Sequence, residues 1–305
     1  MNTSSLNDIL DFNSSLEQSF TLKGLLKGGI GMLIAAPNIG KSHLALCIAI
    51  EHASSSTLLG LSASSIGKKT IVLSSEDGAA VLKERMSKKL AQLPISVKKE
   101  LDSNLSFMTD LEPLVIPPES SAQRKKEHDA YIADLIDTLS HYDLAIIDTV
   151  TEAIGECEEV KHDRLIKNAL QHIAKQSGCS LLLVHHVNKD EIRGTQEITM
   201  ASGAGLTSIM RLTKFLMTLQ KRKGVLSLKY LKSNYLSTGE SQDIVLEIRD
   251  NLTIDPQVFS VKSLSGAKVK RQTAAIKEEP TRITLSGVPP ETEEIKDRQS
   301  LRDVL

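Results

Sequence analysis

The chain has 305 residues, enough for one large domain with additional segments at its ends. Its 37 Lys and Arg balance 38 Asp and Glu, so attraction to nucleic acid has to come from local clusters and not from a global field. The start lacks the blocks of a signal peptide, no apolar run approaches the ~20 residues of a membrane span, and the three cysteines are scattered. We therefore expect a cytoplasmic protein without a membrane partner.

Strands and helices alternate through the first two thirds of the chain. Short apolar runs predict strands, and apolar residues at helical spacing predict helices that pack on a sheet. The strands are expected within residues 28–37, 69–77, 104–110, 143–152 and 179–186, and the helices within 41–53, 78–93, 130–142 and 164–178, the last closed by Gly178. This alternation predicts an α/β fold with a mostly parallel central sheet and helices on both faces.

The pattern changes toward both ends. Residues 213–235 and 241–250 look like short paired strands with tight turns, which we expect to extend the sheet in antiparallel fashion. The expected organisation is an N-terminal arm (1–20) with a short amphipathic helix, a catalytic domain (21–264) and a flexible C-terminal tail (265–305), because the tail loses apolar periodicity and mixes Pro, Glu and Lys.

The stretch IAAPNIGKSH (34–43) combines a strand end, a loop and a helix start. The beginning of a helix presents free backbone N–H groups and a positive dipole end to an anion. Gly40 allows close approach of a phosphate, Lys41 reaches the β and γ phosphates, and the Ser42 hydroxyl binds Mg²⁺. Ala35 replaces the first glycine of the usual motif, and a small residue can fill that place. The expected nucleotide-binding residues are Ala36, Pro37, Asn38, Ile39, Gly40, Lys41, Ser42 and His43.

Two further strands end in carboxylates. Asp148 closes the apolar run of DLAIIDTVTE, where it can hold Mg²⁺ through water with support from Thr149. Glu76 ends the strand after the first helix and is the candidate base for the water that attacks the γ-phosphate, with Asp77 as the second choice. The alternative for both acids is a helix-capping turn.

His185 and His186 end another buried strand. Adjacent histidines point to opposite sides of a strand, so they do not suit joint chelation of a metal, but one of them can contact the γ-phosphate. The loop that follows carries Lys189 and Arg193, which could meet a nucleic-acid backbone or simply be solvated.

Several motifs together resemble the RepA-type replicative helicases of plasmids, which are AAA-type P-loop ATPases with a RecA-like core, as are the DnaB helicases. The matching motifs, within residues 20–250, are APNIGKS, VLSSED, LAIIDT, LLLVHH, ASGAGLTSIMR and KSNY. The resemblance implies a hexameric ring that hydrolyses ATP with Mg²⁺ at subunit interfaces and moves 5′ to 3′ along single-stranded DNA. It also implies roles for Lys41, Ser42, Glu76 and Asp148, for His186 as γ-phosphate sensor, for Arg211 as the arginine finger and for Lys232 as a second trans-acting cation.

The expected function is therefore an ATP-dependent DNA helicase of a plasmid, phage or integrated element, with a primase or origin-binding protein as a possible partner. Where relatives carry Arg-Gly-Ser-Ser before the finger, this chain has SGAGL. The alternatives are a recombination or mobile-element ATPase that does not unwind DNA, and a regulatory or anti-phage module that uses ATP as an assembly switch.

Overall fold

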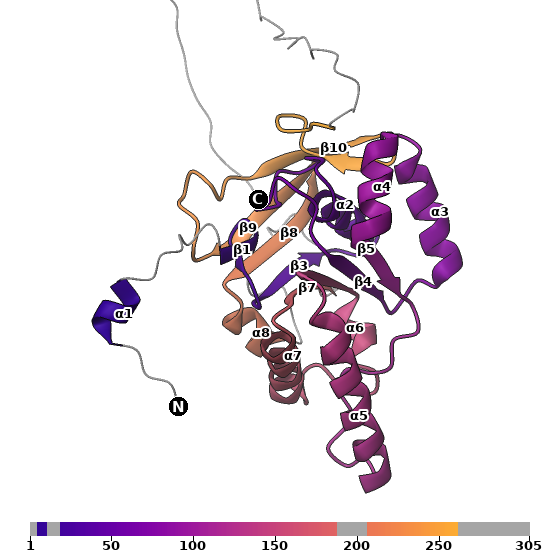
Figure 1. The fold of residues 1–305 in the computed structure, drawn as a ribbon, viewed down its shortest axis with the longest axis vertical. Coiled ribbons are helices and arrows are strands. Elements are labelled where there is room, and N and C mark those ends of the chain that lie inside the picture. Colours follow the sequence, from indigo (N-terminus) through magenta and orange to yellow (C-terminus); the bar gives the residue numbers. More distant parts are fainter. Residues whose placement is uncertain (1–4, 11–18, 188–205, 262–305) are drawn as a thin grey trace, which may run out of the picture. The chain divides into compact units, whose positions relative to one another are not determined.

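A nine-stranded sheet forms the centre of the structure, a computed structural model that describes residues 5–10, 19–187 and 206–261 (Figure 1). The strands are β3 (Ile30–Ala35), β4 (Thr70–Ser74), β5 (Leu105–Met108), β6 (Leu144–Asp148), β7 (Ser180–His186), β8 (Phe215–Arg222), β9 (Val225–Ser233), β10 (Ile244–Arg249) and β11 (Leu252–Ile254). Their order is β11-β10-β9-β8-β3-β7-β6-β4-β5. The strands from β8 to β5 are parallel, and β9, β10 and β11 extend the sheet in antiparallel fashion, as expected.

Helices cover both faces of this sheet (Figure 1). One face carries α2 (Lys41–Ala53), α3 (Ala79–Leu90) and α4 (Ile95–Asn104); the other carries α5 (Ala122–Leu139), α6 (Val150–Ala153), α7 (Asp163–Ser177) and α8 (Thr207–Leu212). Successive residues of a strand point to opposite faces, so Leu33 packs in the first hydrophobic cluster and Ile34 in the second. The two-layer covering confirms the expected α/β architecture.

Several elements were not anticipated from the sequence. They are α4, α6, α8, and the hairpin of β1 (Phe20–Leu22) and β2 (Leu25–Leu26). Helix α5 also begins at Ala122, well before the apolar pattern starts, because Ser121 caps it by accepting a hydrogen bond from the Arg124 backbone N–H at 3.2 Å. In α4 only Val97 and Leu101 are buried, too few to produce a recognisable helical period.

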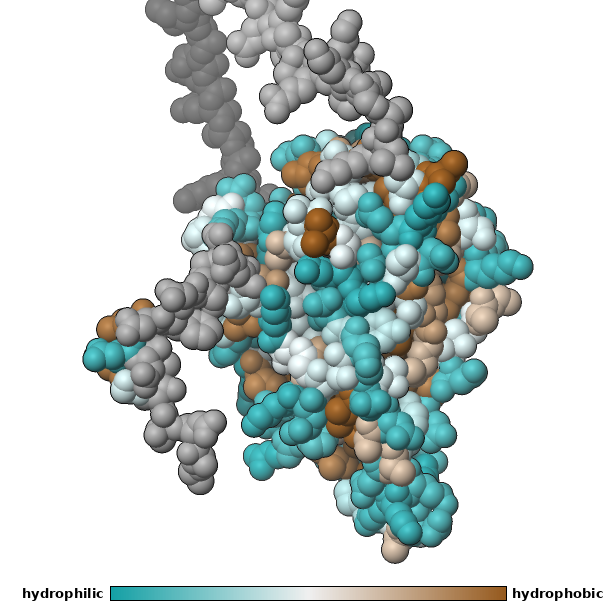
Figure 2. All heavy atoms as spheres, in the orientation of Figure 1, coloured by the Kyte–Doolittle hydropathy of each residue, from teal (hydrophilic) through white to brown (hydrophobic). Residues whose placement is uncertain are grey.

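The N-terminal arm contains α1 (Leu6–Leu10), whereas the expected C-terminal tail lies outside the described residues. The described residues from 19 to 187 and from 206 to 261 belong to one compact unit. Within the described part, no helix has both the length and the apolar character needed to cross a membrane. Hydrophilic residues cover most of the visible face, with single hydrophobic residues among them (Figure 2).

Glu51 of α2 holds the loop that follows this helix. Its side chain is 2% exposed, and its two carboxylate oxygens accept hydrogen bonds from five consecutive backbone N–H groups. The donors are Leu58 at 2.7 Å, Leu59, Gly60 at 2.9 Å, Leu61 at 2.5 Å and Ser62 at 2.6 Å. A buried carboxylate thus takes the place of backbone partners that the loop cannot supply.

Replacing Glu51 with alanine is expected to lower the free energy of unfolding by about 3 kcal/mol or more, because several buried N–H groups lose their acceptor together. Urea unfolding followed by circular dichroism measures the change. Glu84→Ala, which removes an exposed carboxylate paired with Lys88 on α3, is the control and should leave the midpoint unchanged. Equal midpoints for the two variants would contradict the anchoring role of Glu51.

Candidate functional site

The turn between β3 and α2 has the geometry of an anion-binding loop. Ala35, the last residue of β3, is fully buried, so its small side chain belongs to the core. Gly40 has φ 98°, a left-handed conformation that strongly favours glycine, and Asn38 is also left-handed with φ 64°. Lys41 is the first helical residue and is 7% exposed. The free N–H groups at the start of α2 and the Lys41 ammonium therefore point to one anion position.

The other residues expected to bind nucleotide surround this turn. Ile39 packs partly on the hydrophobic cluster of the α2 face, and Ala36 packs on the cluster of the opposite face. Pro37 is half-buried. His43 lies on α2, where partial desolvation of its ring and the positive charges of Lys89 and Arg85 lower its pKa. Through Ile39 and Ala36, the loop thus packs on the hydrophobic clusters of both faces of the sheet.

Asp148 lies beside the helix start. It ends β6, is 8% exposed, and is hydrogen-bonded to the side chain of Ser42. Burial raises the pKa of this carboxyl, although the Ser42 hydrogen bond and the charge of Lys41 oppose the effect. Its Oδ1 is buried and has no hydrogen-bond partner in the structure.

This unsatisfied oxygen fits a hydrated divalent cation. Mg²⁺ usually keeps several waters and takes one or two protein oxygens together with substrate phosphates. Ser42 and Asp148 would hold it, Asp148 through water. Within the described residues there is no group of three or more His, Cys, Asp or Glu that could hold a metal ion.

Glu76 is held in place by two side chains, those of Thr149, directly after β6, and of His186, at the end of β7. The Thr149 hydroxyl donates to Glu76 Oε1 at 2.8 Å, and His186 Nε2 lies 3.3 Å from the same oxygen. Burial by itself would raise the pKa of Glu76, but these hydrogen bonds and the charge of Lys41 outweigh it and lower the pKa. Glu76 is therefore ionised at neutral pH, as a base must be before it accepts a proton.

Asp77 and His185, the neighbours of these residues, have other partners. Asp77 forms an ion pair with Arg85 of α3. His185 is 2% exposed, and its Nδ1 lies 3.2 Å from the Thr151 hydroxyl. Within each adjacent pair, only Glu76 and His186 contact one another.

Strand register explains why four distant segments meet. Ala35 pairs with His186, and Asp148 pairs with both Val184 and Ser74. Parallel neighbours end at the same edge of a sheet, so the phosphate loop, Glu76, Asp148 and His186 gather at the carboxyl edge. The role of Thr149 differs from the expected one, because its hydroxyl supports Glu76 and not Asp148.

Arg211 and Lys232 lie together, but away from this group. Arg211 is exposed at the end of α8, and Lys232 Nζ donates to its backbone carbonyl at 2.9 Å. Lys232 pairs with Leu216 at the beginning of β8, which runs parallel to β3, so these cations stand toward the amino edge of the sheet. They cannot serve the phosphate loop of their own chain. Lys189 and Arg193 lie outside the described residues.

Comparison with known proteins gives a family match and a shared fold. A family model described as an AAA domain (AAA_25) matches residues 6–191. No curated protein matches the chain in sequence.

Three solved structures are similar. The ATPase domain of G40P has a TM-score of 0.52 and 10% identity, with 75% of this chain and 85% of that chain covered. A KaiC-like protein of the hyperthermophilic archaeon Pyrococcus horikoshii OT3 has 0.50 and 13%, covering 77% and 92%. The RadB recombinase has 0.48 and 14%, covering 76% and 92%. The first two confirm the RecA-like α/β fold.

Proposed function

Because this chain belongs to the AAA domain family AAA_25, we propose that it is a Mg²⁺-dependent ATPase that works on DNA. The observation that carries the proposal is the position of Glu76. It is ionised, held by Thr149 and His186, and faces the same edge of the sheet as Lys41 and Asp148. A positioned base opposite a phosphate loop is what hydrolysis of the γ-phosphate requires.

Each residue has a defined task in this reaction. Glu76 orients a water molecule and accepts its proton as the water oxygen attacks the γ-phosphorus, while the bond to the β-phosphate oxygen breaks and ADP leaves. Lys41 stabilises the charge that develops on the β and γ oxygens. Bound Mg²⁺ would neutralise phosphate charge. His186, which touches Glu76, is placed to sense the loss of the γ-phosphate.

Arg211 and Lys232 supply the argument for assembly. Since they stand away from their own phosphate loop, they act only if they reach a nucleotide bound by another copy of the chain. Such a trans-acting cation couples hydrolysis to oligomerisation. We propose a homo-hexameric ring with Arg211 as the finger and Lys232 as a second cation at each interface.

A subunit-mixing experiment tests this arrangement. Arg211→Ala and Glu76→Gln proteins should each be inactive alone. In an equal mixture about a quarter of the interfaces combine an intact Glu76 with an intact Arg211 from the neighbour, and hydrolysis should return in that proportion. Mixing Arg211→Ala with Lys41→Ala,Arg211→Ala protein is the control, because it restores no finger. A mixture as inactive as this control would count against action in trans.

The proposed work of this ATPase is movement along single-stranded DNA and unwinding of duplexes in replication of a plasmid, phage or integrated element. The three cysteines are free and buried, which suits the reducing cytoplasm. A primase or origin-binding protein is the proposed loading partner.

The deciding experiment measures the ATPase rate with and without single-stranded DNA, together with the mass of the oligomer and separation of a forked duplex. We expect stimulation by DNA, a hexamer mass and strand separation that requires ATP and Mg²⁺. Stimulation without strand separation would leave a recombination-type ATPase, and hydrolysis indifferent to DNA would favour an assembly switch.

A further inference from the structure

We propose that a basic trough between α7 and α8 binds the phosphodiester backbone of single-stranded DNA. The trough joins two neighbouring cavities that share Leu212 as a lining residue. The inference rests on the proposed function, since it presumes that the ATPase acts on DNA. It assigns the contact to described residues of the domain and not to Lys189 and Arg193, for which the sequence left open either a nucleic-acid contact or solvation.

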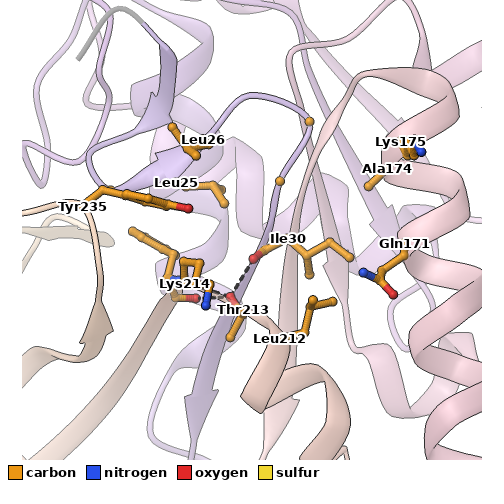
Figure 3. A pocket seen from close by; sticks show the side chains of 14 residues that line it. Leu25, Leu26, Ile30, Gln171, Ala174, Lys175, Leu212, Thr213, Lys214 and Tyr235 are labelled. Atoms are coloured by element: carbon orange, nitrogen blue, oxygen red, sulfur yellow. Dashed lines mark hydrogen bonds between the residues drawn. The ribbon is translucent and has the colours of Figure 1, made fainter. Parts of the chain in front are cut away.

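The two cavities differ in their lining. The first has a volume of about 540 Å³ and is polar, lined by Arg164, Lys167, Asn168, Ser208, Arg211 and Leu212. The second, of about 330 Å³, continues toward the amino edge of the sheet (Figure 3). Figure 3 shows Gln171 and Lys175 of α7 on one side and Tyr235 and Leu26 on the other, with Ile30 and Leu212 between them.

Four cations of the trough are available to DNA. Arg164, Lys167 and Lys175 project from α7, and Lys214 stands opposite them, whereas Arg211, which also lines the trough, is the proposed finger. Within the described part of the chain, none of the four forms an ion pair. The sequence from 206 to 239 contains no Asp or Glu at all.

Asp163, the acidic residue of α7, does not form an ion pair with these cations. Asp163 accepts hydrogen bonds from the Ser208 backbone N–H at 2.9 Å and the Thr207 hydroxyl at 3.0 Å, which caps α8. The pKa of the nearby Lys232 is lowered by burial and by the positive charge of Lys214. Among the described residues of α7, α8 and the segment to Lys214, cations thus outnumber acids, in a chain whose net charge is −1.

The spacing of these cations suits a polyanion with regular charges. Arg164 and Lys175 are eleven residues apart on α7, which is about 17 Å at the rise of an α-helix. A nucleic-acid strand carries one phosphate per nucleotide, so consecutive phosphates along that length can each meet a cation. One small anion would engage only one end of the trough.

The floor of the second cavity favours a single strand over a duplex. Leu25, Leu26, Ile30 and Phe215 make it apolar, and the ring of Tyr235 lies at its side (Figure 3). Only unpaired bases expose faces that can pack on apolar or aromatic side chains, because base pairs in a duplex are stacked on one another. The cations of the trough would contact the phosphates of a single strand, and the apolar residues of the second cavity would contact its bases.

The test measures the affinity of a fluorescein-labelled oligo-dT by fluorescence anisotropy over a range of salt concentrations. The variant is the triple substitution Lys167→Gln, Lys175→Gln and Lys214→Gln, which leaves the proposed finger Arg211 intact. The control is Lys83→Gln, Lys99→Gln and Lys126→Gln, three exposed lysines of α3, α4 and α5 with the same change in charge. Circular dichroism verifies folding, and ATPase activity without DNA and oligomer mass are recorded for each protein.

We expect the trough variant to bind oligo-dT on the order of 10- to 100-fold more weakly, and its slope of log affinity against log salt to fall by about 2, at ~0.7 per lost phosphate contact. Basal hydrolysis and oligomer mass should stay unchanged. Equal affinities for variant and control would overturn the trough while leaving a DNA-stimulated ATPase in place. If the wild type binds no oligo-dT at all, the proposed function itself fails. A variant that loses the oligomer would instead identify the trough as a contact between copies and overturn the proposal.

Discussion

Glu76→Gln protein is expected to bind ATP as the wild type does and to hydrolyse it about 10²- to 10⁴-fold more slowly, the usual contribution of a positioned general base. The glutamine amide has nearly the same shape, and its oxygen can still accept the hydrogen bond from Thr149. It cannot take the proton of the attacking water. Steady-state phosphate release gives the rate, and titration with a fluorescent ATP analogue gives the affinity.

The separation of rate from affinity is the informative result. Glu84→Gln, a change of an exposed acid on α3, is the matched control and should retain the wild-type rate. If Glu76→Gln lost less than tenfold in rate, the base would have to be another group. Asp77 is a poor substitute because Arg85 already engages its carboxylate.

Lys41→Ala is expected to lower the hydrolysis rate by about 10³-fold or more and to weaken nucleotide binding as well. Lys41 is nearly buried at the start of α2, where water screens a charge poorly, so its attraction for phosphate oxygens is stronger than that of a surface lysine. Unlike the Glu76 change, this one removes an interaction with the bound nucleotide as well as with the transition state.

The same two assays distinguish the variants. Lys83→Ala, an exposed lysine of α3, serves as the control for loss of a positive charge and should behave as wild type. Undiminished hydrolysis by Lys41→Ala protein would refute the nucleotide site as a whole. Reduced affinity with an unchanged rate at saturating ATP would instead limit Lys41 to binding.

Local features of the sequence were sufficient to predict the turn between β3 and α2, the proposed phosphate loop. A buried strand, a turn with Gly40 and an apolar-patterned helix after Lys41 lie within a few residues of one another, and each has its own signature. Gly178, with φ 70° at the end of α7, is another such case. These conformations are set by residues adjacent in the chain, so a short stretch of sequence is enough to predict them.

The hydrogen-bond and ion-pair partners of Glu76 and Asp77 could not be predicted from local sequence in this way. The sequence favoured Glu76 over Asp77 as the base, but it did not predict that Arg85 pairs with Asp77 while Thr149 and His186 hold Glu76. Those partners approach because β6 lies next to β4 and β7 lies next to β6. Strand order is a property of the whole sheet, and no short stretch encodes it.

The sequence by itself determined the fold class, the phosphate loop and the residues that end each strand, because hydrophobic period and backbone conformation are local. Only the tertiary structure decided which side chains meet. In the folded chain Glu51 meets five backbone N–H groups, and Arg211 lies away from the proposed phosphate loop of its own chain. Cations of α7 and α8 line a common trough. Such contacts join residues far apart in the chain, and their energies depend on burial and distance that exist only after folding.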